Sequence, residues 1–477
     1  MIALLLTLAF GEPLSYEAAL SSAQKKNPDI KASMLDVEQS DAGILIAKAV
    51  LDPTFNASVG QNLSTKQQFF AGFGLFNTEI SGLNWSTGLS AILPTGTSMT
   101  LDWTSNRSAT KYQLQDAPIE QEVNPYDTSL NLNINQPLLE GILPSYNLRG
   151  LREAQSTRSL SQLTQNETEQ RILRDVARNY WELYHNAKLV DIAEQSLRIA
   201  RDEKRNVMAQ IEEGNLPPIE QTRMESAELT AQSALIDAQN QYITIKEQLL
   251  LLLGSSTALD IRPSSSPPAV QDQNYDEKEI VAIVLQQNPS IIRLRAVLSL
   301  ERDRLNNYKH EALPTLNATA RFSLNGWDES LSTALDELIQ GALPGRYLGL
   351  TFNMPLSNMA VQGNKRKQQA ALSKAEIELQ QMEQSLTQQT RAALRNIQSA
   401  QIKYNLAQTN LKLAQQTDAA DRALRDAGRK TQLEILNSIK SVENAQMAME
   451  RAQTDYLLAQ IDLHTLMGIP LYKGSTP

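Results

Sequence analysis

Apolar residues recur at alternating steps of four and three along two long parts of the chain. They are Val176, Tyr180, Leu183, Ala187 and Val190 in the first part, and Leu372, Ala375, Leu379, Met382 and Leu386 in the second. This spacing predicts helices that bury one face against neighbouring helices. We expect long helices over 145–213 and 357–427, each roughly 100 Å long at ~1.5 Å per residue.

A simple antiparallel coiled coil would show the same spacing, so the periodicity alone does not exclude it. The core positions include many Ala, however, and the opposite faces carry Gln, Asn, Ser and Thr in place of dense ion pairs. These features favour a sheet of helices that has one solvated face.

Stretches of strictly alternating apolar and polar residues lie within two further regions, 54–135 and 315–353. Leu130, Leu132 and Ile134, for example, are each followed by Asn. This period of two predicts strands that have one apolar face and one polar face. It suits a β-barrel with an apolar outside and a polar lumen, and it also suits an ordinary antiparallel sheet with one solvated face. An export signal at the N-terminus favours the barrel.

The first strand region is longer than the second, and the extra length contains a predicted hairpin over 84–107. Alternating residues flank a turn at 94–96 within it. The pattern leaves open whether this hairpin joins the barrel. Two core strands per half cannot close a barrel, because small closed barrels need about eight strands. Several chains would therefore share one barrel, which predicts an oligomer.

The two halves of the chain repeat the same landmarks in the same order, which indicates an internal duplication. The landmarks are Asn27-Pro28, Pro53, Pro137, Gly214 and Gly254 in the first half, and Asn288-Pro289, Pro314, Pro355, Gly428 and Gly468 in the second. In each half a leading helix, a strand region and a very long helix precede a Gly-containing break, and a return helix follows it.

The duplication sets the expected domain boundaries. The first structural repeat covers 12–262 and the second covers 277–468, with a Pro/Ser-rich connector at 263–276 and a C-terminal tail at 469–477. Residues 1–11 contain an apolar run that ends in a small-x-small pattern, which predicts a signal peptide. The alternative for that segment is the buried start of a helix.

Composition narrows the classes of function. The chain has no Cys, three scattered His and a formal net charge of −9, so thiol chemistry is excluded and nucleic acid is not expected as a partner. It contains no His cluster, phosphate-binding Gly-rich loop or nucleophile elbow, so we expect no metal site, no cofactor and no enzymatic activity. His185 is expected to be a packing residue.

Several duplicated motifs carry a family resemblance that extends over nearly the whole chain. They are "KKNPDI" and "QQNPSI", "LDPTFNASVG" and "ALPTLNATAR", "NQPLLEG" followed by "LREAQ", and the stretches around "EEGNLPPIEQ" and "DAGRKTQLEI". In this order they resemble the TolC-like outer membrane efflux protein family, the outer membrane factors. Each single motif is weak, and the duplicated order is what is specific.

The resemblance implies an α+β fold with a duplicated helix–strand–helix unit. It implies a homotrimer with one shared transmembrane β-barrel in the outer membrane of a Gram-negative-type cell and a long α-helical coiled-coil barrel in the periplasm. It also implies a passive exit duct for a tripartite efflux or type I secretion system, which docks to a periplasmic adaptor and an inner-membrane pump. The sequence contains no Met- or His-rich tract that would indicate a metal cargo.

The resemblance places the two Gly breaks at the periplasmic tip. It assigns adaptor docking to Glu213, Gly214, Asn215, Ala427, Gly428 and Arg429. It assigns a tunnel constriction to Glu434 and Asn437, where the family has two carboxylates and this chain has one. It assigns a gate latch to Glu220 with Lys430, or with Arg425, which stands where the family has Tyr. Ordinary solvated charges at the tip are the alternative.

The competing interpretation is an interaction protein, either a periplasmic adaptor or a structural coiled coil. An adaptor is expected to carry one α-hairpin flanked by β-rich domains, whereas this sequence predicts two helix pairs with strands between them. A structural rod would need neither the period-two strands nor an export signal.

Overall fold

The computed structural model describes residues 12–70, 74–114, 120–214, 216–255, 259–270, 275–427 and 429–471. The predicted signal peptide, 1–11, lies outside these residues. The chain divides into two compact units. The helical unit comprises Met1–Glu38, Leu160–Ala296 and Ile377–Pro477, and the sheet unit comprises Gln39–Ser159 and Val297–Glu376.

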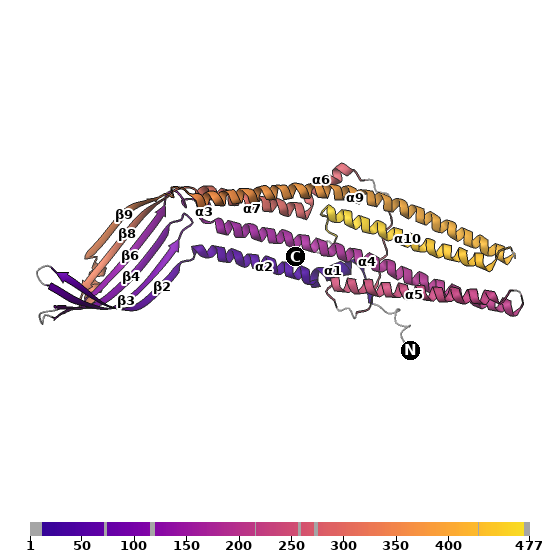
Figure 1. The fold of residues 1–477 in the computed structure, drawn as a ribbon, viewed down its shortest axis with the longest axis horizontal. Helices are drawn as coiled ribbons and strands as arrows, with labels where there is room; N and C mark the ends of the chain where they lie inside the picture. Colours follow the sequence, from indigo (N-terminus) through magenta and orange to yellow (C-terminus); the bar gives the residue numbers. More distant parts are fainter. Residues whose placement is uncertain are drawn as a thin grey trace. The chain divides into compact units, whose positions relative to one another are not determined.

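The sheet unit is built on one antiparallel sheet (Figure 1). Its strands are β2 (Thr54–Phe70), β3 (Gly74–Ile92), β4 (Ser98–Leu114), β5 (Glu120–Val123), β6 (Tyr126–Pro137), β8 (Thr315–Asp328) and β9 (Leu343–Asn353). Neighbouring strands follow the order β2-β3-β4-β6-β8-β9, and β5 pairs with β4. The two halves of the chain meet where β6 pairs with β8, and β2 and β9 are the two edges of this path.

The predicted hairpin forms and belongs to the main sheet. β3 and β4 pair with each other, and Ile92 lies opposite Ser98 in the pair nearest the turn. β4 also pairs with β6. The alternation predicted four core strands, two in each half. That number is too low, because the longer first region alone contributes four strands to the main sheet, namely β2, β3, β4 and β6. The short helix α8 (Leu331–Gln340), which the sequence pattern did not predict, lies between β8 and β9.

The sheet has one apolar face and one polar face, as the alternation predicts. Across the strands, Phe55, Leu89, Leu101, Leu132 and Phe322 are successive partners. The adjacent row contains Asp102 and Asn131, and the Asn131 amide donates to the Asp102 carboxylate at 3.0 Å. Paired residues of neighbouring strands point to the same face, so polar and apolar rows segregate across the sheet.

The helices reproduce the duplicated order. They are α1 (Tyr16–Lys26), α2 (Pro28–Lys48), the short helices η1 (Ala49–Leu51) and α3 (Pro144–Asn147), α4 (Arg149–Glu212), α5 (Ile219–Leu252), α6 (Glu277–Gln287), α7 (Pro289–Glu311), α9 (Met359–Asp426) and α10 (Gln432–Leu466). Two short strands, β1 (Glu12–Leu14) and β7 (Ile261–Pro263), pair in parallel. The architecture is therefore α+β, with one helix–strand–helix unit present twice. Among the described helices, none is both long enough and apolar enough to cross a bilayer.

The apolar stripe of the long helices forms the core of the helical unit. Val176, Tyr180 and Leu183 of α4 are fully buried, and they pack in one cluster with residues of α1, α5 and α10. A second cluster joins α6, α7, α9 and α10 around Ile397 and Tyr456. The predicted coiled-coil seam is thus the buried face of these helices.

The repeated Asn-Pro and terminal Gly landmarks meet in space, once in each repeat. The Asn27 amide donates to the Leu252 carbonyl at 2.8 Å, and the Asn288 amide donates to the Leu466 carbonyl at 3.0 Å. Both Asn residues are buried. Each side chain therefore ties the corner between two leading helices to the end of the return helix. We call these two places the Asn corners.

Candidate functional site

Both long helices turn back at the same end of the helical unit, and we call these two turns the tip (Figure 1). The first turn connects α4 to α5 and contains Gly214, whose φ of 76° requires the left-handed region. The second turn connects α9 to α10, which begins after the N-cap residue Thr431.

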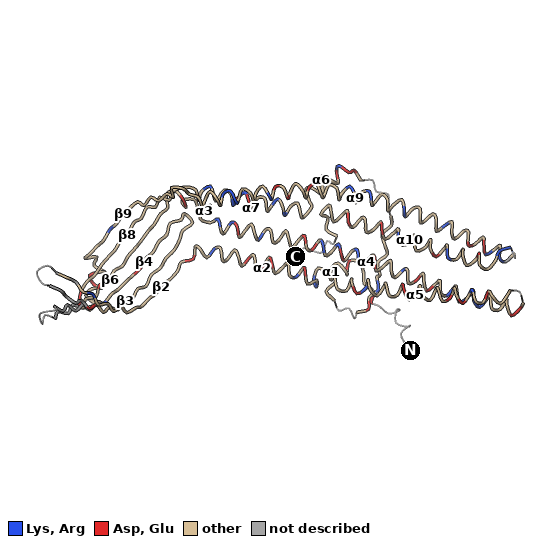
Figure 2. Tube along the Cα trace, in the orientation of Figure 1, with Lys and Arg blue, Asp and Glu red and all other residues tan. Residues whose placement is uncertain are grey.

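The predicted adaptor-docking residues are exposed where the structure describes them. Glu213, Gly214, Ala427 and Arg429 are exposed, whereas Asn215 and Gly428 lie outside the described residues. The two turns differ in charge. Figure 2 shows acidic residues at the α4–α5 turn and basic residues at the α9–α10 turn.

A buried carboxylate links three helices just behind the tip. Glu203 of α4 is 6% exposed. A guanidinium nitrogen of Arg425, from α9, lies 3.5 Å from its carboxylate oxygens, and the Gln432 amide of α10 donates to it at 3.1 Å. We call this the Glu203 cluster. Burial of a carboxylate is tolerated here because a cation and a hydrogen-bond donor offset the lost hydration.

Glu203 is not among the residues predicted for the site, although the sequence carried a signal for it. The residue falls on the apolar stripe of α4, between Leu197 and Val207, both of which are buried. An acidic residue on a buried stripe is unusual unless a partner is present. The sequence therefore allows Glu203 to be identified as a candidate site residue, but it does not show which residues Glu203 contacts.

Lys430 forms an ion pair within its own turn. Its ammonium lies 2.9 Å from the Asp421 carboxylate of α9 and 3.9 Å from the Glu434 carboxylate of α10. The hydrogen bond with Asp421 raises the pKa of Lys430. The second turn is thereby tied to the end of α9.

Glu434 caps the helix on which it lies. Its carboxylate accepts from both the backbone N–H and the hydroxyl of Thr431 at 2.8 Å, and the Thr431 hydroxyl accepts from the Glu434 N–H, which forms a capping box. The backbone hydrogen bond from Thr431 is the main cause that lowers the pKa of Glu434, so the carboxylate is charged at neutral pH.

Glu220 pairs with a neighbour on α5. One carboxylate oxygen accepts from Arg223 at 2.6 Å, and the other is buried with no hydrogen-bond partner among the described residues. The predicted latch joined Glu220 to Lys430 or to Arg425. Within this chain, Glu220 contacts Arg223. Lys430 contacts Asp421, and Arg425 contacts Glu203, because their helices direct the side chains to different neighbours.

A groove of about 680 Å³ lies between α4, α5 and α10. Asn437 lines it together with Ile219, Arg223 and Lys440, whereas Glu434 is engaged at the helix cap. The two residues predicted for the constriction therefore have different surroundings. Only Asn437 faces this groove.

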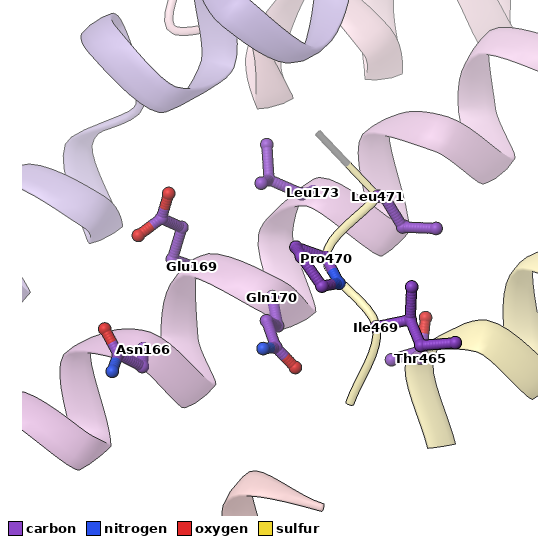
Figure 3. Close-up of a pocket in the computed structure, with 8 residues that line it drawn as sticks. All are labelled: Asn166, Glu169, Gln170, Leu173, Thr465, Ile469, Pro470 and Leu471. Carbon is purple, nitrogen blue, oxygen red and sulfur yellow. The ribbon is translucent and has the colours of Figure 1, made fainter. Parts of the chain in front are cut away.

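A smaller hollow of about 170 Å³ lies between α4 and the segment after α10 (Figure 3). Its one charged lining residue, Glu169, accepts a hydrogen bond from Gln24 at 2.6 Å. Within the described part of the chain, His, Asp and Glu side chains form no group of three that could hold a metal ion.

His185 lies on the buried face of α4, as the sequence predicts for a packing residue. Its Nδ1 is buried without a hydrogen-bond partner among the described residues. Burial lowers its pKa, and Arg451 lowers it further, while Glu182 and Asp455 oppose the shift. The imidazole is therefore held neutral.

Comparison with known proteins matches the chain to one family. The family model for the outer membrane efflux protein matches residues 98–255 and 281–469. Outer membrane protein TolC of Escherichia coli (strain K12) is 23% identical over 247 residues, which cover 49% of this chain and 48% of that protein. The match thus spans about half the length of this relative.

Two further similarities cover more of the chain. Outer membrane protein TolC of Salmonella enteritidis is 20% identical over 359 residues, which cover 72% of this chain and 70% of that protein. The crystal structure of the Campylobacter jejuni CmeC outer membrane channel superposes with a TM-score of 0.68 at 14% identity, and the alignment covers 97% of this chain and 87% of that one. The likeness in fold therefore extends over both repeats.

Proposed function

The chain belongs to the outer membrane efflux protein family, and from this premise we propose that it is the passive exit duct of a tripartite efflux or type I secretion system. The protein is located in the outer membrane and extends into the periplasm. The family is one of efflux channels, not of enzymes. We propose that the chain acts as a homotrimer with a periplasmic adaptor and an inner-membrane pump as partners.

The observation that carries the proposal is a sheet with segregated faces and two open edges. One face presents Phe55, Leu101 and Phe322, and the other presents Asp102 and Asn131. A sheet with open edges is prone to pair with another chain, and closure into a barrel removes the edges. Pairing β9 of one copy with β2 of the next would close a barrel with an apolar outside and a polar lumen.

The tip is the proposed docking and gating end of the duct. The exposed residues Glu213, Gly214, Ala427 and Arg429 are available to an adaptor, and their turns carry opposite charge. An adaptor hairpin of mixed charge would complement both turns.

The Glu203 cluster is the proposed holder of the closed tip. It joins α4 to the ends of α9 and α10, so it must break if α9 and α10 move away from α4. The Lys430–Asp421 pair fixes the second turn to α9, and Glu220 is proposed as a further contact at the gate. Glu434 and Asn437 are the proposed constriction residues, with the Glu434 charge partly offset by Lys430.

Purification and bilayer recordings test the proposed function. The protein extracted in detergent is expected to run as a trimer and to insert into planar bilayers as a discrete ion channel. A protein that stays monomeric and soluble without detergent, and that forms no channels, would contradict the duct. That outcome would favour a periplasmic adaptor or a structural coiled coil.

A further inference from the structure

The sheet unit carries an exposed apolar surface where β9 gives way to α9. Met354, Leu356 and Met359 follow β9, and their exposed fractions are 54%, 100% and 76%. On the opposite edge, Ile46 at the end of α2 and Val50 in η1 are exposed in the same way. Apolar surface of this extent at the end of a strand region marks an interaction surface.

Basic side chains follow this apolar surface directly. Lys365, Arg366 and Lys367 are exposed on α9, and the sequence from 354 to 375 contains no acidic residue. Arg149 begins α4 and is exposed beside the same region. The chain as a whole has a net charge of −9, so this concentration of positive charge runs against its overall balance.

These basic residues form no ion pair with any described residue, although other cations of the same unit do. We call the set the basic band, and its members are Lys48, Arg149, Arg152, Lys309, Lys365, Arg366 and Lys367. Farther along the helices, Arg158 pairs with Asp41, Arg302 pairs with Glu376, and Arg304 pairs with Glu153. Within the described helices of the sheet unit, the cations without an ion pair thus lie next to the strands.

A hollow of about 740 Å³ lies within the basic band. Arg149 and Lys367 line it together with Tyr146, Tyr308 and Glu311. The Arg149 guanidinium lies 4.3 Å from the centre of the Tyr146 ring, which holds the cation at the wall of the hollow. The hollow is large enough for a phosphate-containing head group, and its two unpaired cations outnumber its one unpaired carboxylate.

We infer that the basic band binds the head groups of anionic phospholipids in the periplasmic leaflet of the outer membrane. Apolar surface followed by clustered cations matches the two layers of a leaflet, acyl chains and then phosphates. The inference rests on the proposed insertion of the strands into the membrane. The proposed pairing of β9 with β2 of the next copy would bring Lys48 of that copy toward the basic residues of α9, so the trimer would add a further cation to the basic band.

Lipid binding to the purified full-length protein tests the inference. The variant Lys365→Gln/Arg366→Gln/Lys367→Gln is compared with the control Lys25→Gln/Lys26→Gln/Lys31→Gln. The control removes the same charge from exposed positions in the helical unit. Phosphatidylglycerol and phosphatidylcholine are each titrated into the detergent-solubilised protein, at low and high salt.

Wild type and control are expected to prefer phosphatidylglycerol. The α9 variant should lose about fivefold in apparent affinity for this lipid per cation removed, with little change for phosphatidylcholine. High salt should weaken the preference, because it screens charge. An α9 variant that keeps the full preference, or a control that loses it equally, overturns the inference. The inference is also overturned if inorganic phosphate competes for the site as strongly as phosphatidylglycerol does, since the site would then bind a free anion.

Channel recordings separate this inference from the proposed function. The α9 variant is expected to keep the trimeric state and the conductance of the wild type in phosphatidylcholine bilayers. A conducting trimer without lipid preference overturns only the lipid site. A variant that loses the trimer shows that the basic residues contact a second copy, and a wild type without channel activity overturns both proposals.

Discussion

Arg425 of α9 lies 3.5 Å from the carboxylate of Glu203, a buried residue of α4 that is 222 positions earlier in the sequence. Replacing Glu203 with Ala removes the acceptor for both Arg425 and Gln432. The loss of such a buried acceptor costs about 1–3 kcal/mol. We expect Glu203→Ala to raise the open probability and mean conductance of the channel in planar bilayers.

Matched variants show whether this effect is specific. Glu212→Gln changes an exposed carboxylate at the end of the same helix and should leave conductance unchanged. Lys430→Ala and Glu220→Ala test the other proposed gate contacts, and each should open the tip less than Glu203→Ala. A Glu203→Ala channel as closed as the wild type would show that the Glu203 cluster does not hold the tip.

Glu434 has a role in helix capping that can be separated from its charge. Glu434→Gln keeps an acceptor for the Thr431 N–H but removes the charge, so we expect a small drop in melting temperature at neutral pH and a fall in cation selectivity. Thr431→Ala removes the capping box and should lower stability by about 1 kcal/mol. Asn437→Asp should add a second acidic position and raise cation selectivity. Reversal potentials in a salt gradient and thermal unfolding measure the two effects.

The capping box also predicts a dependence on pH. The folded state lowers the pKa of Glu434, so its contribution to stability is present above the ordinary carboxyl range. It should be lost as the pH falls through the lowered pKa. Thermal unfolding of Glu434→Gln should be less sensitive to pH in this acidic range than that of the wild type, and equal sensitivity would argue against the capping role in solution.

The Asn corners should contribute equally in the two repeats. Asn27→Ala and Asn288→Ala each leave a buried return-helix carbonyl without its donor, and each should destabilise the protein by about 1–3 kcal/mol. Asn166→Ala, a substitution on α4, serves as the control for an Asn that no corner uses. A much smaller effect in one repeat would show that the two corners are not energetically equivalent.

The terminal glycines of the return helices have a steric reason to be Gly. Gly254 and Gly468 adopt φ of 64° and 70°, and a Cβ at either position would overlap the carbonyl oxygen of Lys26 or Gln287. Gly254→Ala and Gly468→Ala should therefore each lower the melting temperature. Gly363→Ala is the control, because a Cβ on this helical Gly would meet open space and should stabilise the helix slightly.

His185 makes the stability of the helical unit depend on pH. Its folded pKa is lowered, so the unfolded chain binds a proton more readily. Stability should be full above the unfolded pKa of about 6.5 and should fall as the pH drops toward the folded value. Partial burial also lowers the pKa of His464. His185→Gln/His464→Gln should flatten the melting temperature between about pH 7 and pH 5, and an unchanged slope would contradict this assignment.

The repeat pattern of the sequence accounts for most of the fold. The steps of four and three predicted the long helices, since α9 spans Met359–Asp426 within the expected 357–427. The alternation predicted the strands and their faces. The number of strands was wrong, because alternation gives the direction of side chains but not the point at which a long extended stretch turns back.

The sequence by itself determined the duplication, the two tip turns and the residues that could act there. It also showed that Glu220, Arg425 and Lys430 carry charge near those turns. Only the tertiary structure decided which charges meet, and it joined Arg425 to Glu203 and Lys430 to Asp421. The physical reason is that each residue along a helix rotates the side chain by about 100°, so a contact between helices depends on their packing and relative rotation.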